Sequence, residues 1–223
     1  MMKYLFFGSI GVMAETSNVQ RQCYNMALAE FDTGLSWNVA SYCALIRTPG
    51  GLDRLERLGI DAKTAQKIHH RKQELFAAAM ADGVPARPGI IDMIAYCLSQ
   101  DIKMAFVTST TRQTISAVMT ALSGEIDFDK FSAVLCADDV DRAKPDPAIY
   151  HRAMTMVGAS AQDDVLVIED TMANCGAAEA AGLRSVFYPG EFALTHHYQQ
   201  SEQTLSVERC LAAFAEPPLS SVA

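Results

Sequence analysis

Four polar side chains lie directly after short hydrophobic segments and a fifth follows a turn, and all five could bind a phosphate group or a metal ion. Thr108 and Ser109 precede an expected helix, and hydroxyls together with the free N–H groups of a helix start can bind an anion. Lys144 stands between a turn and a proline-started helix, where a fixed ammonium could face the same ligand. Glu169 and Asp170 are adjacent, and carboxylate oxygens are the ligands that Mg²⁺ prefers. These residues predict a phosphate site beside a metal site.

Each of these residues also has an ordinary structural interpretation. The hydroxyls of Thr108 and Ser109 could simply cap a helix. A lysine in the position of Lys144 is usually solvated. Asp170 could cap the helix expected to begin at Met172, in which case no metal would be held there. The residues taken one by one leave these alternatives open, and it is their common location that favours a site.

Hydrophobic segments alternate with helical patterns along most of the chain. Short apolar runs predict strands at 3–7, 103–107, 133–136, 164–168 and 184–187. Helical patterns occupy 89–99, 111–122, 147–157 and 172–181. This alternation is typical of an α/β fold with a parallel sheet. Ligands of such a sheet bind beyond the carboxyl ends of its strands, which is where the polar residues lie.

Residues 16–84 interrupt the alternation, because they show helical patterns and almost no strand pattern. Helices are expected there at 19–31, 37–46, 52–60 and 62–80. We therefore expect an all-helical domain, 16–84, inserted after the first strand of a core that is formed by 1–15 and 85–223.

Three segments resemble known sequence motifs. VTSTT (107–111), AKPDPAIY (143–150) and VLVIEDTMANCGAAEAAGL (165–183) resemble motifs II, III and IV of the haloacid dehalogenase (HAD) superfamily. The most similar branch contains β-phosphoglucomutase and the CbbY-like sugar-phosphate phosphatases. The resemblance implies a Rossmann-like core with a parallel sheet, an inserted all-helical cap that closes over the site, and Mg²⁺-assisted phosphoryl transfer from a phosphorylated metabolite.

The resemblance also assigns roles to the polar residues. It implies that Thr108, Ser109 and Lys144 bind phosphate, and that Glu169 and Asp170 hold the metal. These roles agree with the chemistry of the side chains.

The first motif departs from the family pattern at the two residues that carry the reaction. The run FFGSIGVMAET keeps Phe7, Gly11 and Glu15 in register with that pattern. Gly8, however, stands at the position of the aspartate nucleophile, and Ile10 at that of the acid/base aspartate. Glycine cannot attack phosphorus or bind Mg²⁺ through a side chain, and isoleucine cannot transfer a proton. Losing one member of a covalent catalytic unit typically costs about 10⁴ to 10⁶ in rate.

The cap shows parallel changes. Gln20 stands where the family often has a histidine, and Leu52 where it often has a lysine. Arg21 and Arg54 remain as cations, and Glu15 keeps the acidic position at the start of the cap. We expect these residues on the substrate side of the site, with a weaker grip on an anionic sugar phosphate.

The leading hypothesis is a CbbY-like protein of HAD fold whose phosphohydrolase activity is lost or severely reduced, and which binds a phosphorylated metabolite. Its Mg²⁺ site is expected to be weakened, because one ligand is missing. A first alternative is an active phosphatase in which Glu15, Glu169, Asp170 or a directly attacking water replaces the nucleophile. A second alternative is a non-catalytic subunit that binds a partner protein.

The composition is that of a globular protein. Half of the 223 residues are hydrophobic and 20% are charged, which argues against extensive disorder. The net charge of −8 argues against nucleic-acid binding, which needs clustered lysine and arginine. No stretch of 18 apolar residues occurs, so we expect no contact with a membrane. The six widely spaced cysteines include no CxxC pair, which favours free thiols in a reducing cytoplasm over a zinc site and leaves one disulfide open.

The N-terminal segment 1–14 has two interpretations. Lys3 is followed by an apolar run in which Val12 and Ala14 are spaced like a cleavage site, as in a secretory signal. The same run is also typical of a buried strand followed by a glycine-containing turn. We favour the strand because the predicted sheet needs one here, and we expect a cytoplasmic protein.

Overall fold

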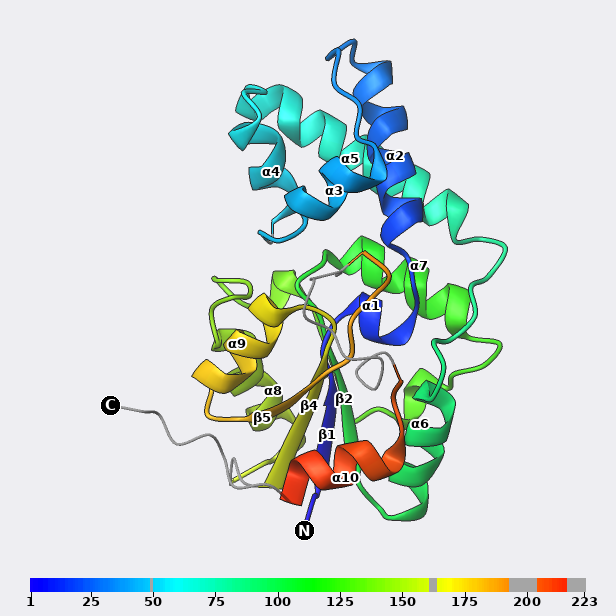
Figure 1. Ribbon diagram of the computed structural model, residues 1–223, viewed down its shortest axis with the longest axis vertical. Coiled ribbons are helices and arrows are strands. Elements are labelled where there is room, and N and C mark those ends of the chain that lie inside the picture. The colour runs from blue at the N-terminus through cyan, green and yellow to red at the C-terminus, as the bar shows by residue number, and fades with distance from the viewer. Residues whose placement is uncertain (49, 161–163, 193–203, 216–223) are drawn as a thin grey trace.

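The core is a five-stranded sheet in which all strands run parallel (Figure 1). The computed structural model describes residues 1–48, 50–160, 164–192 and 204–215. The strand order is β3-β2-β1-β4-β5, with β1 Tyr4–Phe7, β2 Lys103–Val107, β3 Ala133–Leu135, β4 Val165–Glu169 and β5 Arg184–Phe187. The predicted α/β fold with a parallel sheet is confirmed, and every strand lies within one residue of its expected bounds.

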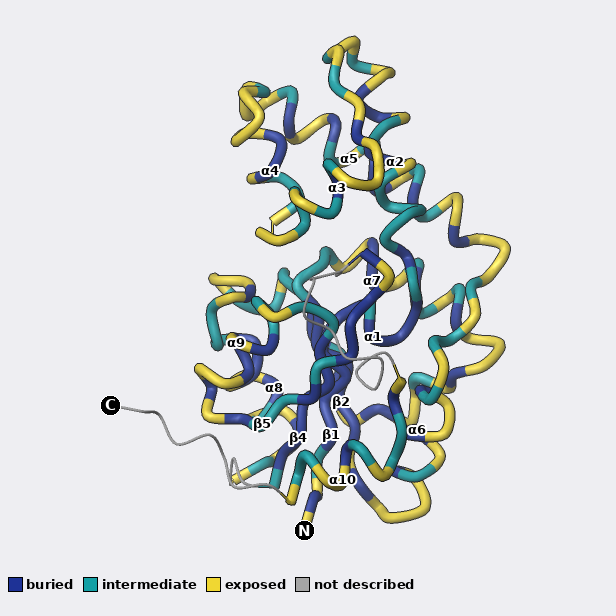
Figure 2. The backbone as a smooth tube through the Cα atoms, in the orientation of Figure 1, coloured by how far each residue is buried: buried dark blue, intermediate teal, exposed yellow. Residues whose placement is uncertain are grey.

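Both faces of the sheet are covered, which explains why its strands are hydrophobic throughout. The covering helices are α6 Ile90–Ser99, α7 Arg112–Leu122, α8 Ala148–Val157, α9 Met172–Ala180 and α10 Val207–Ala215. Successive side chains of a strand point to opposite faces. Leu5 and Phe7 therefore pack with α6, α7 and α10, whereas Phe6 packs with α8 and α9. Figure 2 shows the resulting buried strands at the centre of the core.

Helix α10 is absent from the sequence-based expectation, which ended at β5. Its buried Cys210 belongs to the same hydrophobic cluster as Leu5 and Phe7, and the helix packs on β5 and α6. The nine-residue segment is amphipathic, so a periodic signal was present, but it is short and isolated from the regular alternation.

The inserted helices lie above the carboxyl ends of the strands (Figure 1). They are α2 Ser17–Glu30, α3 Val39–Leu45, α4 Gly51–Arg57 and α5 Ala62–Ala79, close to their expected positions. They have their own hydrophobic cluster, which includes Tyr24, Trp37 and Ile68. The exact bounds of the insertion, 16–84, stay a prediction. Between β1 and α2 the chain forms a short helix, α1 Ile10–Met13, where a turn was expected.

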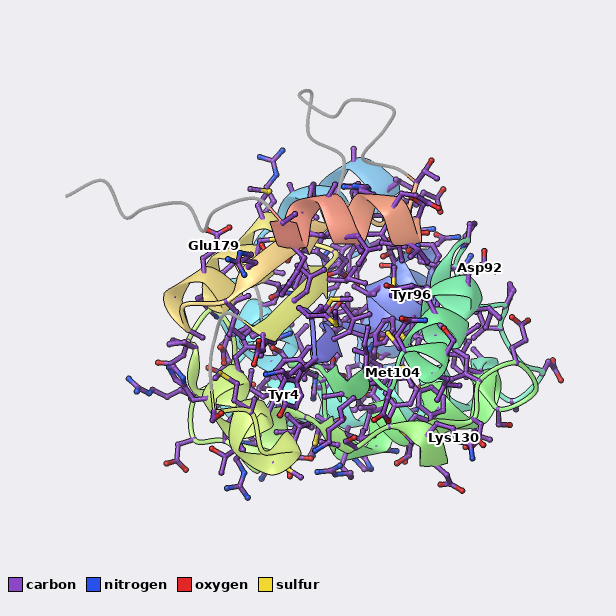
Figure 3. All side chains as sticks on the ribbon, turned by 90° about the horizontal axis from the view of Figure 1, so that it is seen from below. Tyr4, Asp92, Tyr96, Met104, Lys130 and Glu179 are labelled. Carbon is purple, nitrogen blue, oxygen red and sulfur yellow. The ribbon has the colours of Figure 1, made fainter. Side chains whose placement is uncertain are left out.

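The opposite end of the sheet has an ordinary surface. Viewed from that end, Figure 3 shows Asp92, Lys130 and Glu179 around the periphery and Met104 nearer the centre. The first three residues are exposed, and Met104 is buried. The candidate site lies at the other end, beyond the carboxyl ends of the strands.

The structure also bears on two features that composition raised, the state of the cysteines and the presence of membrane-spanning helices. All six cysteines are free thiols, five of them buried and Cys43 partly exposed. Among the described residues, no helix combines the length and the apolar character needed to cross a membrane.

Candidate functional site

A cavity of about 580 Å³ lies between the carboxyl end of the sheet and the inserted helices. Residues that follow β1, β2 and β4 line one side of it, and residues of α2, α4 and α5 line the other. The residues predicted from the sequence that line this cavity are Ile10, Gln20, Leu52, Arg54, Thr108, Ser109 and Asp170. In the described part of the chain, the predicted residues outside its lining are Gly8, Glu15, Arg21, Lys144 and Glu169.

Lys144 is buried and joins the ends of three adjacent strands. Its ammonium donates to the carbonyl oxygen of Gly8 after β1 (2.8 Å), to that of Val107 in β2 (2.9 Å), and to the carboxylate of Glu169 in β4. An ammonium has three hydrogens, so these acceptors account for all of them. The phosphate-binding role of Lys144 stays a prediction, and in this arrangement the ammonium has no N–H left to donate into the cavity.

Glu169 is fully buried, and both of its carboxylate oxygens are engaged. Oε1 accepts from Lys144 and from the hydroxyl of Tyr150, and Oε2 accepts from the backbone N–H of Asp170 at 3.2 Å. Burial raises the pKa of the Glu169 carboxyl, while Lys144 favours its charged form. Burial, with the adjacent Glu169, also raises the pKa of Tyr150 well above its ordinary value, so that the hydroxyl remains a donor.

The carboxylate of Glu169 occupies the space that a side chain at position 8 would need. A Cβ added to Gly8 would lie 2.2 Å from Cδ of Glu169 and 2.6 Å from the carbonyl oxygen of Ile168. Atoms in close-packed interiors do not approach one another so closely. The end of β1 therefore lacks a reactive side chain, and the adjacent volume is filled.

The residues present do not fit a Mg²⁺ site. Mg²⁺ requires a nearly octahedral set of oxygen ligands, usually including one or two carboxylates. Gly8 supplies no carboxylate, and the oxygens of Glu169 already have partners. Among the described residues, no group of three or more His, Cys, Asp or Glu side chains could hold a metal ion. We therefore derive no chemical step through a metal.

Asp170 faces the cavity instead of capping a helix. Thr171 is the N-cap of α9, because its side chain accepts from the backbone N–H of Asn174 at 3.2 Å. The interpretation of Asp170 as the cap was therefore wrong. Oδ1 of Asp170 accepts from the side-chain amide of Asn174 at 3.3 Å. Thr171 fills the cap because it is the extended residue immediately before the helix.

Thr108 and Ser109, which follow β2, do not cap α7 either. Thr111 is the N-cap of that helix, and its side chain accepts from the backbone N–H of Thr114 at 3.3 Å. Thr108 is buried, and its Oγ1 accepts from the backbone N–H of Thr110 at 3.3 Å. Interpreting Thr108 and Ser109 as a plain cap was thus wrong, because the helix begins later.

Two buried hydroxyls in the cavity lining lack a partner. The Oγ atoms of Ser9 and Ser109 are buried and make no hydrogen bond within the described structure. Leaving a buried polar group unsatisfied is unfavourable, and each such group needs an explanation. A polar ligand in the cavity would provide the missing partner. Ser9 was not predicted, since the sequence gives a single serine at this position no distinguishing signal.

Lys72 in α5 is a buried cation that sequence reasoning missed. It is 3% exposed and lines the cavity. Its ammonium donates to Oε1 of Gln20 at 2.8 Å and lies 5.0 Å from the ring centroids of Tyr24 and Phe76. Lys72 takes part in no ion pair formed by the described residues. Burial lowers the pKa of Lys72 to about 8.

Arg54 is a second buried cation in the lining. Its guanidinium donates to the carbonyl oxygens of Leu45 and Thr48, both at 3.3 Å, and lies 5.9 and 5.8 Å from the ring centroids of Tyr24 and Tyr42. These partners orient the charge without neutralising it. Burial and the neighbouring cations lower the pKa of His69 to about 4, so its imidazole is neutral near pH 7.

Arg21 and Glu15 make contacts within the fold. Arg21 donates to the carbonyl oxygen of Trp37 at 2.8 Å and to the side chain of Asn18. Glu15 accepts from the backbone N–H of Glu191 at 2.7 Å. The roles in substrate binding predicted for Arg21 and Glu15 stay predictions.

Gln73 joins the inserted helices to the core. Its amide nitrogen donates to Oγ1 of Thr111 at 3.4 Å, and its amide oxygen accepts from the hydroxyl of Thr114. Gln73 lies in α5 and both threonines belong to the start of α7, so these bonds close one side of the cavity. The sequence contains no local signal that pairs residues so far apart.

The chain is similar to proteins of known family over most of its length. The model of the haloacid dehalogenase-like hydrolases matches residues 11–188, beginning just after Gly8 and Ile10. The CbbY protein of Rhodobacter capsulatus is 33% identical over 199 residues, covering 86% of this chain and 87% of that protein. The CbbY protein of Cereibacter sphaeroides is 30% identical over 223 residues, covering 97% and 94%.

Solved structures show the same likeness. The crystal structure of CbbY from Rhodobacter sphaeroides in complex with phosphate is 30% identical, has a TM-score of 0.80, and covers 89% of this chain and 90% of that one. A mutant of that protein in complex with xylulose-(1,5)bisphosphate matches equally well. This chain belongs to the haloacid dehalogenase-like hydrolase family, in its CbbY-like branch.

Proposed function

We propose that this protein binds a phosphorylated small metabolite and does not hydrolyse it. The observation that carries the proposal is the end of β1. Gly8 has no side chain, and the volume beside it is filled by Glu169, whose carboxylate is bound to Lys144 and Tyr150. Ile10, in the acid/base position, adds an apolar surface to the cavity.

The charges of the cavity support binding of an anion. Lys72 and Arg54 are buried cations whose hydrogen-bond acceptors are uncharged oxygens. Their attraction for an anion is stronger in a partly desolvated cavity than in water. The unpartnered hydroxyls of Ser9 and Ser109 supply donors for phosphate oxygens. The relatives solved with phosphate and with xylulose-(1,5)bisphosphate make these two anions the first probes to test.

The alternative of an active hydrolase requires a carboxylate in the cavity or a water that attacks directly. Glu15 and Glu169, the other carboxylates considered as substitutes, lie outside the cavity lining and are engaged elsewhere. Among the described residues, Asp53 and Asp170 are the carboxylates that line the cavity. The alternative of an interaction subunit predicts that neither probe binds.

Calorimetry should detect binding of xylulose 1,5-bisphosphate, and Lys72→Met should weaken it by about 10- to 100-fold. The substitution removes one charge-assisted hydrogen bond and keeps most of the volume of the lysine stem. Lys67→Met is the matched control, because Lys67 lies exposed on the same helix and outside the cavity lining. Binding that Lys72→Met leaves unchanged would contradict the assignment of this cation.

Anion affinity is expected to fall about tenfold between pH 7 and pH 9. Lys72, with a pKa of about 8, is mostly charged at pH 7 and mostly neutral at pH 9, and only the charged form attracts an anion. Sulfate is the appropriate probe, since its charge is constant over this range. Lys72→Arg should flatten the profile, because a guanidinium stays charged. His69 stays neutral over this range, with its pKa of about 4. A steep profile in the arginine variant would exclude Lys72 as the titrating group.

A further inference from the structure

We propose that the anion site works without a divalent cation, the buried ammonium of Lys144 taking the place of a metal beside Glu169. This inference rests on the proposed function, and it states how the same site holds its ligand.

The first support is the engagement of Glu169. Glu169 is fully buried and lies outside the cavity lining, so turning its carboxylate toward a metal in the cavity would break the bonds of Oε1 to Lys144 and Tyr150. Lys144 would then remain buried without a counter-ion, which is strongly unfavourable. The backbone N–H of Asp170 donates to the second oxygen of Glu169 as well. Metal binding by Glu169 would therefore break the buried ion pair with Lys144, the residue that joins the ends of three strands.

The second support is the loss of ligands at β1. Gly8 has no side chain, and its carbonyl oxygen accepts from Lys144 at 2.8 Å. A side chain introduced at position 8 would collide with Glu169 and with the carbonyl oxygen of Ile168, so this position cannot readily supply a metal ligand. Asp170 is thus the carboxylate that the sheet side contributes to the described cavity lining.

The third support is the charge of the site. The family pattern has two aspartates where this chain has Gly8 and Ile10, so the site carries two negative charges fewer. Those two charges equal the charge of one divalent cation. The charge of Lys144 balances that of Glu169, so no cation is needed to neutralise that carboxylate. Lys72 and Arg54 provide positive charge for the ligand from the opposite wall.

The test compares phosphate binding in EDTA with binding in millimolar Mg²⁺, measured by calorimetry on the full chain. We expect the two dissociation constants to agree within about twofold. An affinity at least tenfold higher in Mg²⁺ would overturn the inference while supporting the proposed function. Absence of binding in both buffers, with xylulose 1,5-bisphosphate as well, would overturn both.

Asp170→Asn gives a second test, because a metal-dependent and a metal-independent site predict opposite changes in phosphate affinity for this variant. If a metal bridged Asp170 and the ligand, this variant should bind phosphate at least tenfold more weakly in Mg²⁺. In a metal-independent site, Asp170 only repels the anion, so the variant should bind phosphate equally well or more tightly.

A third test measures metal binding directly with Mn²⁺. The electron paramagnetic resonance of the free ion should show no stoichiometric binding of Mn²⁺ to the wild-type chain. Stoichiometric binding that Asp170→Asn abolishes would overturn the inference.

Discussion

The purified protein is expected to release phosphate from p-nitrophenyl phosphate or xylulose 1,5-bisphosphate at least 10⁴-fold more slowly than an enzyme turning over at about 1 s⁻¹. Gly8 offers no side-chain atom that could form a bond to phosphorus, and Ile10 cannot protonate a leaving oxygen. What remains is the positioning and electrostatic contribution of the cavity. A continuous phosphate-release assay in Mg²⁺ buffer measures this rate.

Asp170→Asn tests whether any turnover in that assay depends on the carboxylate of Asp170. Asp170 is one of the two carboxylates in the described cavity lining, and the one that follows a strand of the sheet. Activity that survives this substitution does not come from attack by Asp170. Turnover near 1 s⁻¹ that disappears in the variant would establish the active-hydrolase alternative and would contradict the proposed function.

Much of the fold was predictable because each strand carries a local signal. A strand covered on both faces must be apolar throughout, and the five short apolar runs correspond to the five strands within one residue. The polar residues after β2 and β4 could be placed at one edge for the same reason, since parallel strands end on the same side. Thr108, Ser109 and Asp170 do line the cavity there.

The partners of the charged residues were not predictable, because they depend on contacts between distant segments. Lys144 was expected to face a ligand, but its acceptors are Gly8, Val107 and Glu169, at the ends of three strands. A lysine that follows a turn shows nothing in its local sequence that distinguishes these acceptors from a phosphate.

The sequence does contain one signal for Lys72, the buried cation that was not predicted. Ile68, Lys72 and Phe76 are spaced four residues apart, so they share one face of α5, and both apolar neighbours are fully buried. A lysine on the buried face of an amphipathic helix is unusual enough to mark a candidate site. Lys67, outside that face, is exposed.

Glu169→Ala is expected to destabilise the fold by about 3–5 kcal/mol, the usual cost of removing one partner from a buried ion pair. The substitution leaves the ammonium of Lys144 buried with two carbonyl acceptors and no counter-ion. For a chain of this size the melting temperature should fall by roughly 6–20 °C. Chemical and thermal unfolding measure the loss. Glu56→Ala, at an exposed glutamate of α4, should stay within about 0.5 kcal/mol of wild type.

Gly8→Asp completes a cycle that tests whether Glu169 fills the place of the missing side chain. Alone, it should cost about 1–3 kcal/mol, because the new Cβ would meet the Glu169 carboxylate and the carbonyl oxygen of Ile168. Combined with Glu169→Ala, the new carboxylate can use the vacated space and pair with Lys144. The double variant should therefore be more stable than the sum of the two losses predicts, by about 0.5–3 kcal/mol. If the two losses of stability simply add, the carboxylates at positions 8 and 169 do not compete for one site. The explanation that Glu169 fills the space beside Gly8 would then be wrong.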